Sequence, residues 1–220
     1  MWGMKQDALG ADLEAVMTVV QGVILAGGIS SRMGFPKALM PIGDSFFLRS
    51  IYDKLIGAGV SPVHIVINTG LQSSLSAQMS KFAEGRFVLN QEPGLGQLRS
   101  LQLGLAAAQE AGAEAVMMAL VDQPLVDQGT LKILVERYGQ ESGKLVLPLY
   151  EGKRGHPYII PAAHFDAFNQ ADAAGGATAR DVLDSLAASS VCVEVEDAGV
   201  CQDVDTPEDM GKLSVSEDMD

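Results

Sequence analysis

Residues 19–37 read Val-Val-Gln-Gly-Val-Ile-Leu-Ala-Gly-Gly-Ile-Ser-Ser-Arg-Met-Gly-Phe-Pro-Lys, an apolar run that passes directly into a glycine pair and two cations. Residues 19–25 are nearly all apolar, which is typical of a short strand buried on both faces of a sheet. Gly27 and Gly28 lack a Cβ atom, so the backbone can turn sharply after this strand. The pattern predicts a βα unit whose loop lies at the carboxyl edge of a sheet, where open α/β sheets bind ligands.

Beyond this stretch, short apolar runs alternate with segments of helical periodicity. Strands are predicted at residues 19–25, 63–67, 87–89 and 115–121, and amphipathic helices at residues 47–56, 98–108 and 131–138. Strands that alternate with helices predict right-handed crossovers and a mostly parallel sheet with helices on both faces.

The pattern changes in the last third of the chain. Residues 145–150 and 157–160 are strand-like and flank a Glu-Gly-Lys-Arg-Gly turn, which predicts a β-hairpin excursion with one antiparallel strand. Thr178 and Asp181 have the spacing of a capping box at a helix start. Residues 191–195 alternate valine with polar residues, as a half-exposed edge strand does.

The predicted fold class is therefore α/β. We expect one doubly wound, mostly parallel, Rossmann-like domain over residues 19–213, with helices on both faces and a small β-hairpin excursion. Residues 1–18 would form an N-terminal extension and residues 214–220 an acidic tail. Thr206, Pro207 and two acids after them have the composition of a helix start within the domain.

Composition and charge exclude several classes of partner. The net charge of −13 argues against a nucleic-acid partner, because affinity for a phosphate backbone rests on Lys and Arg. The chain has no apolar run of about 18 residues, so no membrane span is expected. Its first residues lack the basic start and apolar stretch of a signal peptide. Cys192 and Cys201 therefore read as reduced thiols of a cytoplasmic protein.

The glycine turn is followed by two cations, Arg32 and Lys37. Successive backbone N–H groups in such a turn form a concavity suited to anions. The guanidinium can hold phosphate oxygens in a fork, and the ammonium adds a point charge. The spacing matches neither a Walker A loop nor a dinucleotide fingerprint. A plain βα turn with solvated cations is the alternative reading.

Residues 25–37 closely resemble the nucleotidyltransferase signature Leu-Ala-Gly/Ala-Gly-x-Ser-x-Arg-Met-Gly-x-x-Lys. They look in particular like the MobA/MocA branch, which attaches GMP or CMP to molybdopterin cofactors, and the resemblance extends from Val19 to about Leu213. It implies transfer of a nucleoside monophosphate from CTP or GTP to a phosphorylated acceptor with Mg²⁺, and transient contact with a molybdenum enzyme. The implied nucleotide-binding residues are Leu25, Ala26, Gly27, Gly28, Ser30, Arg32, Lys37, Gly96 and Ser100, and the implied catalytic residues are Arg32, Lys37 and Asp122.

Two aspartates are candidates for a metal site. Asp122 ends the strand predicted at residues 115–121, and Asp205 precedes the last predicted helix. Mg²⁺ prefers hard oxygen ligands and commonly binds one or two carboxylates together with substrate phosphates. By resemblance, both positions match the metal-binding aspartates of the family. Alternatively, Asp122 is a turn residue before Pro124, and Asp205 is an acid favoured by a helix dipole.

Two further segments bear on the choice of base and acceptor. Residues 90–105 resemble the nucleotide-selecting segment of the family, and Gly96 and Ser100 fit its cytidylyl-type pattern, although Gln97 departs from it. A Gly-His-Pro motif at His156 is typical of the cytidylyl branch, where it borders the acceptor pocket, and Arg180 would meet an acceptor phosphate. The Gly27-Gly28 pair is more usual in guanylyl enzymes, so the signals conflict; CTP is favoured narrowly over GTP.

Two other functions remain open from the sequence. A sugar- or alditol-phosphate nucleotidyltransferase would share the phosphate loop, but such enzymes often carry a longer acceptor region. A non-catalytic nucleotide-binding regulatory module would need the loop without two metal carboxylates. Asp122 and Asp205 therefore discriminate between an enzyme and a binding module.

Overall fold

The described part of this computed structural model, residues 19–28, 35–205 and 209, alternates strands with helices. The β-strands are β1 (Val20–Leu25), β2 (Pro41–Ile42), β3 (Ser45–Phe46), β4 (Val63–Asn68), β5 (Gly85–Asn90), β6 (Ala115–Leu120), β7 (Leu145–Tyr150), β8 (Lys153–Arg154), β9 (Tyr158–Pro161) and β10 (Ser190–Glu194). The α-helices are α1 (Phe47–Gly57), α2 (Thr69–Leu75), α3 (Gly96–Glu110), α4 (Gln128–Gln140), α5 (Phe165–Asn169) and α6 (Ala179–Ser185).

The strands form one main sheet in the order β10-β7-β9-β6-β1-β4-β5, and β8 pairs with β7 beside it. β1 is parallel to β4 and to β6, and β4 is parallel to β5. β9 is antiparallel to β6 and β7, whereas β10 is parallel to β7. The α/β class and the mostly parallel sheet predicted from the sequence are confirmed.

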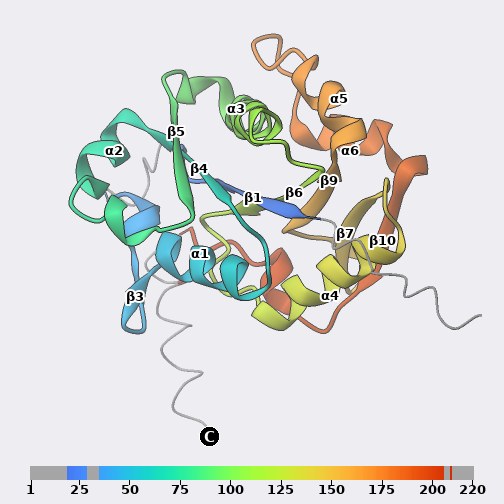
Figure 1. The fold of residues 1–220 in the computed structure, drawn as a ribbon, viewed down its shortest axis with the longest axis horizontal. Helices are drawn as coiled ribbons and strands as arrows, with labels where there is room; N and C mark the ends of the chain where they lie inside the picture. The colour runs from blue at the N-terminus through green and yellow to red at the C-terminus, as the bar shows by residue number, and fades with distance from the viewer. Residues whose placement is uncertain (1–18, 29–34, 206–208, 210–220) are drawn as a thin grey trace, which may run out of the picture.

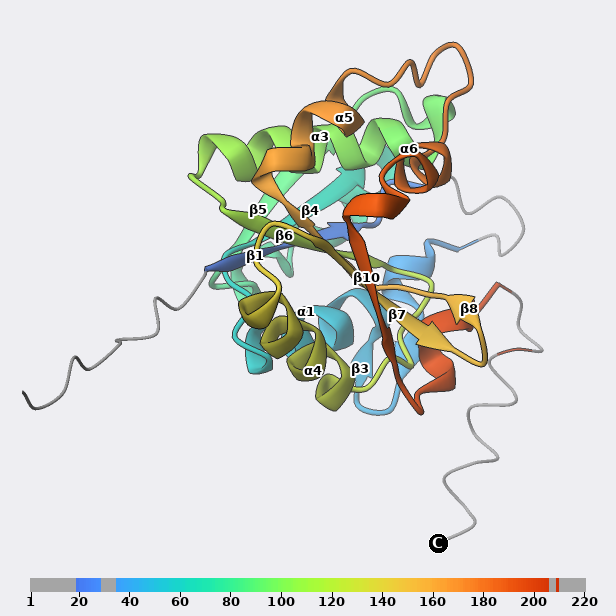
Figure 2. The same cartoon turned by 90° about the vertical axis from the view of Figure 1, so that its right-hand side faces the viewer.

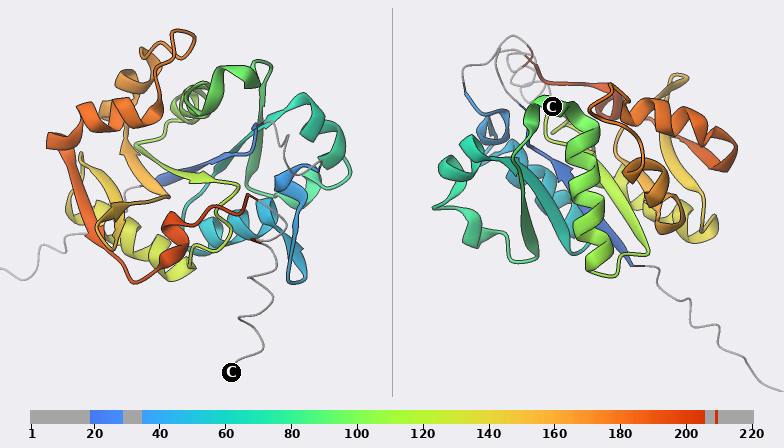
Figure 3. Two further views of the ribbon diagram at one scale, coloured as in Figure 1. Left: turned by 180° about the vertical axis from the view of Figure 1, so that it is seen from behind. Right: turned by 90° about the horizontal axis from the view of Figure 1, so that it is seen from above.

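Helices cover both faces of this sheet (Figures 1 and 2). α3, α5 and α6 lie on one face, and α1 and α4 lie on the other. Seen from above, α3 lies beside α5 and α6 over their shared face (Figure 3). Two apolar clusters fill the spaces between the sheet and these helix layers. The arrangement is a three-layer α/β sandwich.

Burial explains why these elements form where the sequence predicts them. All six residues of β1 are buried, as expected of a strand covered on both faces. On α1, Phe47, Ile51 and Leu55 recur every four residues and are at most 6% exposed. Burying each such side chain contributes about 1.5–3 kcal/mol, so this stripe fixes which side of α1 faces the sheet.

The antiparallel strand lies at a different place from the predicted hairpin excursion. β7 and β8 do form a short antiparallel hairpin, through Leu149 with Arg154 and Tyr150 with Lys153. β9 is not part of that excursion: it lies inside the main sheet between β6 and β7, and all four of its residues are buried. Local periodicity identifies a strand but does not fix its neighbours, which explains this difference.

Several smaller elements follow from capping. The capping box is confirmed, since the Thr178 side chain accepts from the Asp181 N–H and the Asp181 carboxylate accepts from the Thr178 N–H. The sequence did not predict α2, which begins where Asn68 accepts a hydrogen bond from the N–H of Leu71. The helix start predicted at residues 206–209 lies outside the described residues, apart from Asp209.

Among the helices of the described residues, none combines the length and apolar character needed to cross a bilayer.

A buried histidine makes the stability of the fold dependent on pH. His64 on β4 is 1% exposed, and its Nε2 atom lies 2.8 Å from Gln21 Oε1. Burial, followed by the charge of Arg86, lowers the pKa of His64 from 6.5 to about 4. The folded protein therefore keeps this imidazole neutral at a pH where the unfolded chain would bind a proton.

We expect the free energy of unfolding to decrease as the pH falls from about 6.5 to about 4, because only the unfolded state gains a proton there. The loss from His64 is on the order of 3 kcal/mol at the low end of this range. Urea denaturation at several pH values measures it. His64→Gln should make the profile shallower without abolishing it, because burial also lowers the pKa of His156 to about 4 and this second histidine acts over the same range. An equally steep profile in His64→Gln would contradict the assignment.

Candidate active site

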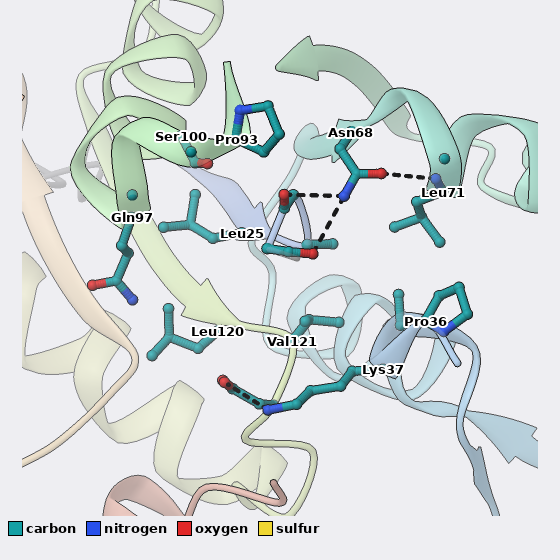
Figure 4. A pocket seen from close by; sticks show the side chains of 18 of the residues that line it. Leu25, Pro36, Lys37, Asn68, Leu71, Pro93, Gln97, Ser100, Leu120 and Val121 are labelled. Atoms are coloured by element: carbon teal, nitrogen blue, oxygen red, sulfur yellow. Dashed lines mark hydrogen bonds and ion pairs between the residues drawn. The ribbon is translucent and has the colours of Figure 1, made fainter. Parts of the chain in front are cut away.

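A cavity of about 770 Å³ lies at the carboxyl ends of β1, β4 and β6 (Figure 4). The glycine turn, the segment after it, the starts of α2 and α3 and the end of β6 supply its lining. These residues are Leu25, Ala26, Gly27, Gly28, Phe35, Pro36, Lys37, Ala38, Asn68, Gly70, Leu71, Pro93, Gly94, Gly96, Gln97, Ser100, Leu120, Val121 and Asp122. The cavity is therefore at the edge of the sheet where the sequence predicts a ligand site.

The glycine turn is held in place by Asn68, which the sequence analysis missed. The Asn68 side-chain amide donates hydrogen bonds to the carbonyls of Gly27 and Gly28 at 3.2 and 3.3 Å. Figure 4 shows this side chain reaching from the end of β4 toward the turn, while its oxygen accepts from the Leu71 N–H. A polar residue directly after the neighbouring parallel strand was the available signal, because both strands end at this edge.

Gly27 lies within van der Waals reach of both α3 and β4. A Cβ atom on Gly27 would lie 3.4 Å from Ser100 Oγ and 3.7 Å from the carbonyl oxygen of Val66. Ser100 is itself fixed, since its Oγ accepts a hydrogen bond of 2.9 Å from the side chain of the fully buried Asn90. The turn from β1 and the first turns of α3 therefore form one continuous wall of the cavity.

The start of α3 gives this wall its electrostatic character. Gly96 and Gln97 lie in the first turn of this helix of 15 residues and line the cavity. Gly96 has a φ of 82°, a left-handed conformation that favours glycine. The N-terminus of a helix carries a partial positive charge and unpaired N–H groups, which suit an anionic or polar ligand.

Lys37 joins the two aspartates that the sequence marks as metal ligands. It begins the 3-10 turn η1 (Lys37–Leu39), and its Nζ atom forms a short ion pair with Asp205 Oδ1. The same Nζ atom lies 3.6 Å from Asp122 Oδ2. Asp122 and Asp205 are far apart in the chain, yet both carboxylates face one ammonium at the rim of the cavity.

The charge of Asp122 is costly in this environment. Burial raises the pKa of Asp122 above its ordinary value, and the neighbouring charge of Asp203 adds to the rise. The ammonium of Lys37 lowers the pKa again, while Asp205 makes a smaller contribution that raises it. A carboxylate that is partly buried among other acids is stabilised by a cation, so this position favours cation binding.

The donor set fits a divalent cation that binds together with a nucleotide. Carboxylate oxygens are the ligands that Mg²⁺ and similar hard cations prefer. Among the described residues, no group of three or more His, Cys, Asp or Glu side chains is arranged to hold a metal by itself. Two carboxylates at the rim of a large cavity leave coordination positions for phosphate oxygens and water, which is the usual arrangement for Mg²⁺.

A half-buried lysine supports the loop that follows Asp122. Lys54 on α1 donates hydrogen bonds from Nζ to the carbonyl oxygens of Pro124 and Val126, at 2.7 and 2.9 Å. Burial lowers the pKa of Lys54, and the charges of Asp127 and Asp197 oppose that shift. The loop is therefore anchored to α1 immediately after the candidate metal ligand.

We expect Lys54→Met to reduce the free energy of unfolding by about 1–3 kcal/mol, because two carbonyl groups of the loop lose their donor. Thermal or urea denaturation measures this loss. Lys132→Met is the matched control, since Lys132 is an exposed lysine on α4 and should change stability very little. Equal stability of the two variants would show that the loop does not depend on Lys54.

Four other predicted site residues are not among those that line the cavity in the described part of the chain. Ser30 and Arg32 fall outside the described residues. Neither His156 nor Arg180 is among the described residues that line the cavity. The His156 N–H donates to the carbonyl of Val200 at 2.8 Å, and its ring lies 5.2 Å from that of Tyr158, measured between centroids. Arg180 is exposed on α6. Their roles toward an acceptor stay predictions.

Comparison with known proteins places this geometry in context. Residues 22–191 match the family model described as the MobA-like NTP transferase domain. A curated relative from Mycobacterium bovis, named probable molybdenum cofactor guanylyltransferase, is 30% identical over 171 residues, which cover 77% of this chain and 80% of the relative.

Two solved structures have the same fold. Molybdopterin-guanine dinucleotide biosynthesis protein A from Archaeoglobus fulgidus superposes with a TM-score of 0.69 at 16% identity, over 91% of this chain and 100% of that one. A Mycobacterium tuberculosis protein in complex with manganese gives a TM-score of 0.67 at 21% identity, over 90% and 100% of the two chains. The relative from Mycobacterium bovis is named for guanylyl transfer, which does not support the narrow preference for CTP.

Proposed function

Because the chain belongs to the MobA-like NTP transferase family, and is thus a nucleotidyltransferase of MobA type, we propose that it transfers GMP from GTP to a phosphate of molybdopterin or its molybdenum form. The observation that carries this proposal is the convergence of Asp122 and Asp205 on Lys37 at the rim of the cavity. A nucleotide-binding module without catalysis would need the glycine turn but not this pair of carboxylates.

The proposed reaction needs little covalent help from the protein. An oxygen of the acceptor phosphate attacks the α-phosphorus of GTP in line. The bond between the α-phosphorus and its bridging oxygen breaks, and pyrophosphate leaves with that electron pair. A phosphate nucleophile is already ionised at neutral pH, so the step requires no general base. Catalysis then comes mainly from alignment and from neutralising charge on the phosphates.

Each side chain of the site has a defined task in this proposal. The backbone N–H groups of Gly27 and Gly28 would cradle the triphosphate, with Leu25 and Ala26 lining the cavity beside them. Lys37, and by resemblance Ser30 and Arg32, would hold its oxygens. Asp122 and Asp205 would hold a divalent cation, with Mg²⁺ proposed, which supplies charge neutralisation at the phosphates when bound.

Lys37 must change partners when substrate binds. In the structure its ammonium forms ion pairs with the carboxylates of Asp122 and Asp205. A Mg²⁺–nucleotide complex brings both the positive charge that these carboxylates need and the negative charge that the ammonium needs. We therefore expect Lys37 to move from the carboxylates toward the phosphates, which exchanges one set of ion pairs for another at little net cost in charge burial.

Two features favour GTP as the nucleotide, and the family resemblance supports the contacts proposed for the acceptor. The guanylyl name of the relative from Mycobacterium bovis and the Gly27-Gly28 pair favour GTP. Gly96 and Ser100, beside Gln97 at the start of α3, would then border the base. His156 and Arg180 are the proposed contacts of the acceptor, and a cytoplasmic location and transient contact with a molybdenum enzyme belong to the same proposal.

A pyrophosphate-release assay tests this function directly. The purified chain is incubated with molybdopterin, Mg²⁺ and either GTP or CTP. Faster release with GTP, dependent on both acceptor and metal, is the expected result. Preferential release with CTP would instead assign a cytidylyltransferase, as the Gly-His-Pro motif at His156 suggests. Nucleotide binding without release for any NTP would replace the enzyme with a binding module.

A further inference from the structure

The loop after β6 and the segment before Asp205 are bound directly to each other. The N–H of Val204 donates a hydrogen bond of 2.7 Å to the carbonyl of Asp122. The side chain of Gln123 donates a second bond, from Nε2 to Asp203 Oδ1, at 2.8 Å. Gln123 directly follows Asp122 in the chain, and Asp203 lies two positions before Asp205. These two bonds fix the distance between the segments that carry Asp122 and Asp205.

Chemistry determines which way the Gln123 amide faces. A carboxylate such as that of Asp203 can only accept hydrogen bonds, so the amide nitrogen must be the atom that faces it. Gln123 is 6% exposed, and its Oε1 atom is buried without a hydrogen-bond partner among the described residues. An unpaired buried carbonyl costs about 1–3 kcal/mol. The unpaired Oε1 atom of Gln123 lowers the stability of the fold, so we explain the position of this side chain by its role in orienting Asp122.

We propose that Gln123 is a positioning residue for the metal site, acting through its hydrogen bond to Asp203. Gln123 sets the orientation of the adjacent Asp122 carboxylate, and Asp203 in turn sets that of Asp205. This inference rests on the proposed function, since it assumes that Asp122 and Asp205 bind the cation.

The effect should appear in metal affinity. Groups that orient metal ligands typically change metal affinity by about 10–100-fold when they are removed. Gln123→Met keeps the length of the side chain and removes its donor, so the dissociation constant for Mn²⁺ should rise by about tenfold. The measurement is electron paramagnetic resonance titration of Mn²⁺ in the presence of GTP and without acceptor, which involves no turnover.

A swapped pair separates positioning from general damage to the fold. In the double variant Gln123→Glu with Asp203→Asn, the asparagine amide donates to the glutamate carboxylate, and both the side-chain lengths and the total charge are kept. Mn²⁺ affinity should return to within about threefold of the original, as expected of paired residues. Gln128→Met is the matched control: Gln128 donates one bond of 2.8 Å to the Gly57 carbonyl, away from the site, and its loss should leave Mn²⁺ affinity unchanged.

The outcomes distinguish this inference from the proposed function. If Asp122→Asn weakens Mn²⁺ binding but a folded Gln123→Met binds Mn²⁺ like the original chain, the positioning role is wrong and the metal site stands. Failure of the swapped pair to recover affinity would also overturn the positioning role. If Asp122→Asn itself leaves Mn²⁺ binding unchanged, the proposed metal site is wrong, and the positioning role that depends on it is wrong as well.

Discussion

Replacing Asp122 with asparagine is expected to reduce Mg²⁺-dependent pyrophosphate release by about a thousandfold or more while the fold stays intact. A metal ligand of this kind supports several kcal/mol of transition-state stabilisation, and each 1.4 kcal/mol corresponds to about tenfold in rate. The variant should be at least as stable as the original chain, because burial and Asp203 raise the pKa of Asp122 and make its charge unfavourable. Steady-state kinetics and thermal denaturation measure the two effects.

The matched control for this prediction is Asp127→Asn. Asp127 is an exposed acid in the same loop, and its side chain makes no capping hydrogen bond to α4. Asp127→Asn changes the net charge by the same amount as Asp122→Asn but removes no candidate metal ligand, so we expect activity to be kept. An Asp122→Asn enzyme with full activity would refute the metal site. A variant that loses both activity and the folding transition would instead assign Asp122 to the structure.

Replacing Lys37 with methionine should have two effects of opposite sign. The value of kcat/KM should fall by about a hundredfold or more, because a preorganised cation at the phosphates is lost. Affinity for Mn²⁺ in the absence of nucleotide should rise, because the ammonium no longer competes for Asp122 and Asp205. Kinetic measurements and Mn²⁺ titration without nucleotide check the two effects separately.

The opposite signs make the Lys37 prediction easy to contradict. A general structural defect would lower both activity and metal affinity. Lys132→Met, on the exposed side of α4, serves as the control and should change neither quantity. An unchanged kcat/KM in Lys37→Met would remove the residue from the reaction.

Much of the frame could be predicted from the sequence because it depends on local pattern. The buried run of β1, the four-residue spacing on α1 and the capping box at Thr178 are all set by residues close together in the chain. Asp122 and Asp205 were also accessible as candidates, because each follows from the position of a strand end or helix start. Pattern and periodicity therefore identified most of the longer elements, though not α2, and strand ends identified the edge of the sheet where the cavity lies.

The contacts that organise the site could not be predicted in the same way. Lys54 reaches carbonyl groups 70 and 72 residues away, and Gln123 reaches Asp203 across 80 residues. Such pairs depend on the order of strands in the sheet, which local periodicity does not contain. The same limit applies to β9, whose sequence indicates a strand but not its place between β6 and β7. His156 and Arg180 were placed by family resemblance alone, and neither lines the cavity.

The position of β9 divides the main sheet into a part that contributes to the cavity lining and a part that does not. Every described residue that lines the cavity comes from the first 122 positions of the chain. The half of the sheet that begins with the reversed strand β9 and includes β7 and β10 supplies none of that lining, and Asp205 joins the site only after this half is complete. Substitutions on β7, β9 and β10 therefore replace none of the side chains that line the cavity.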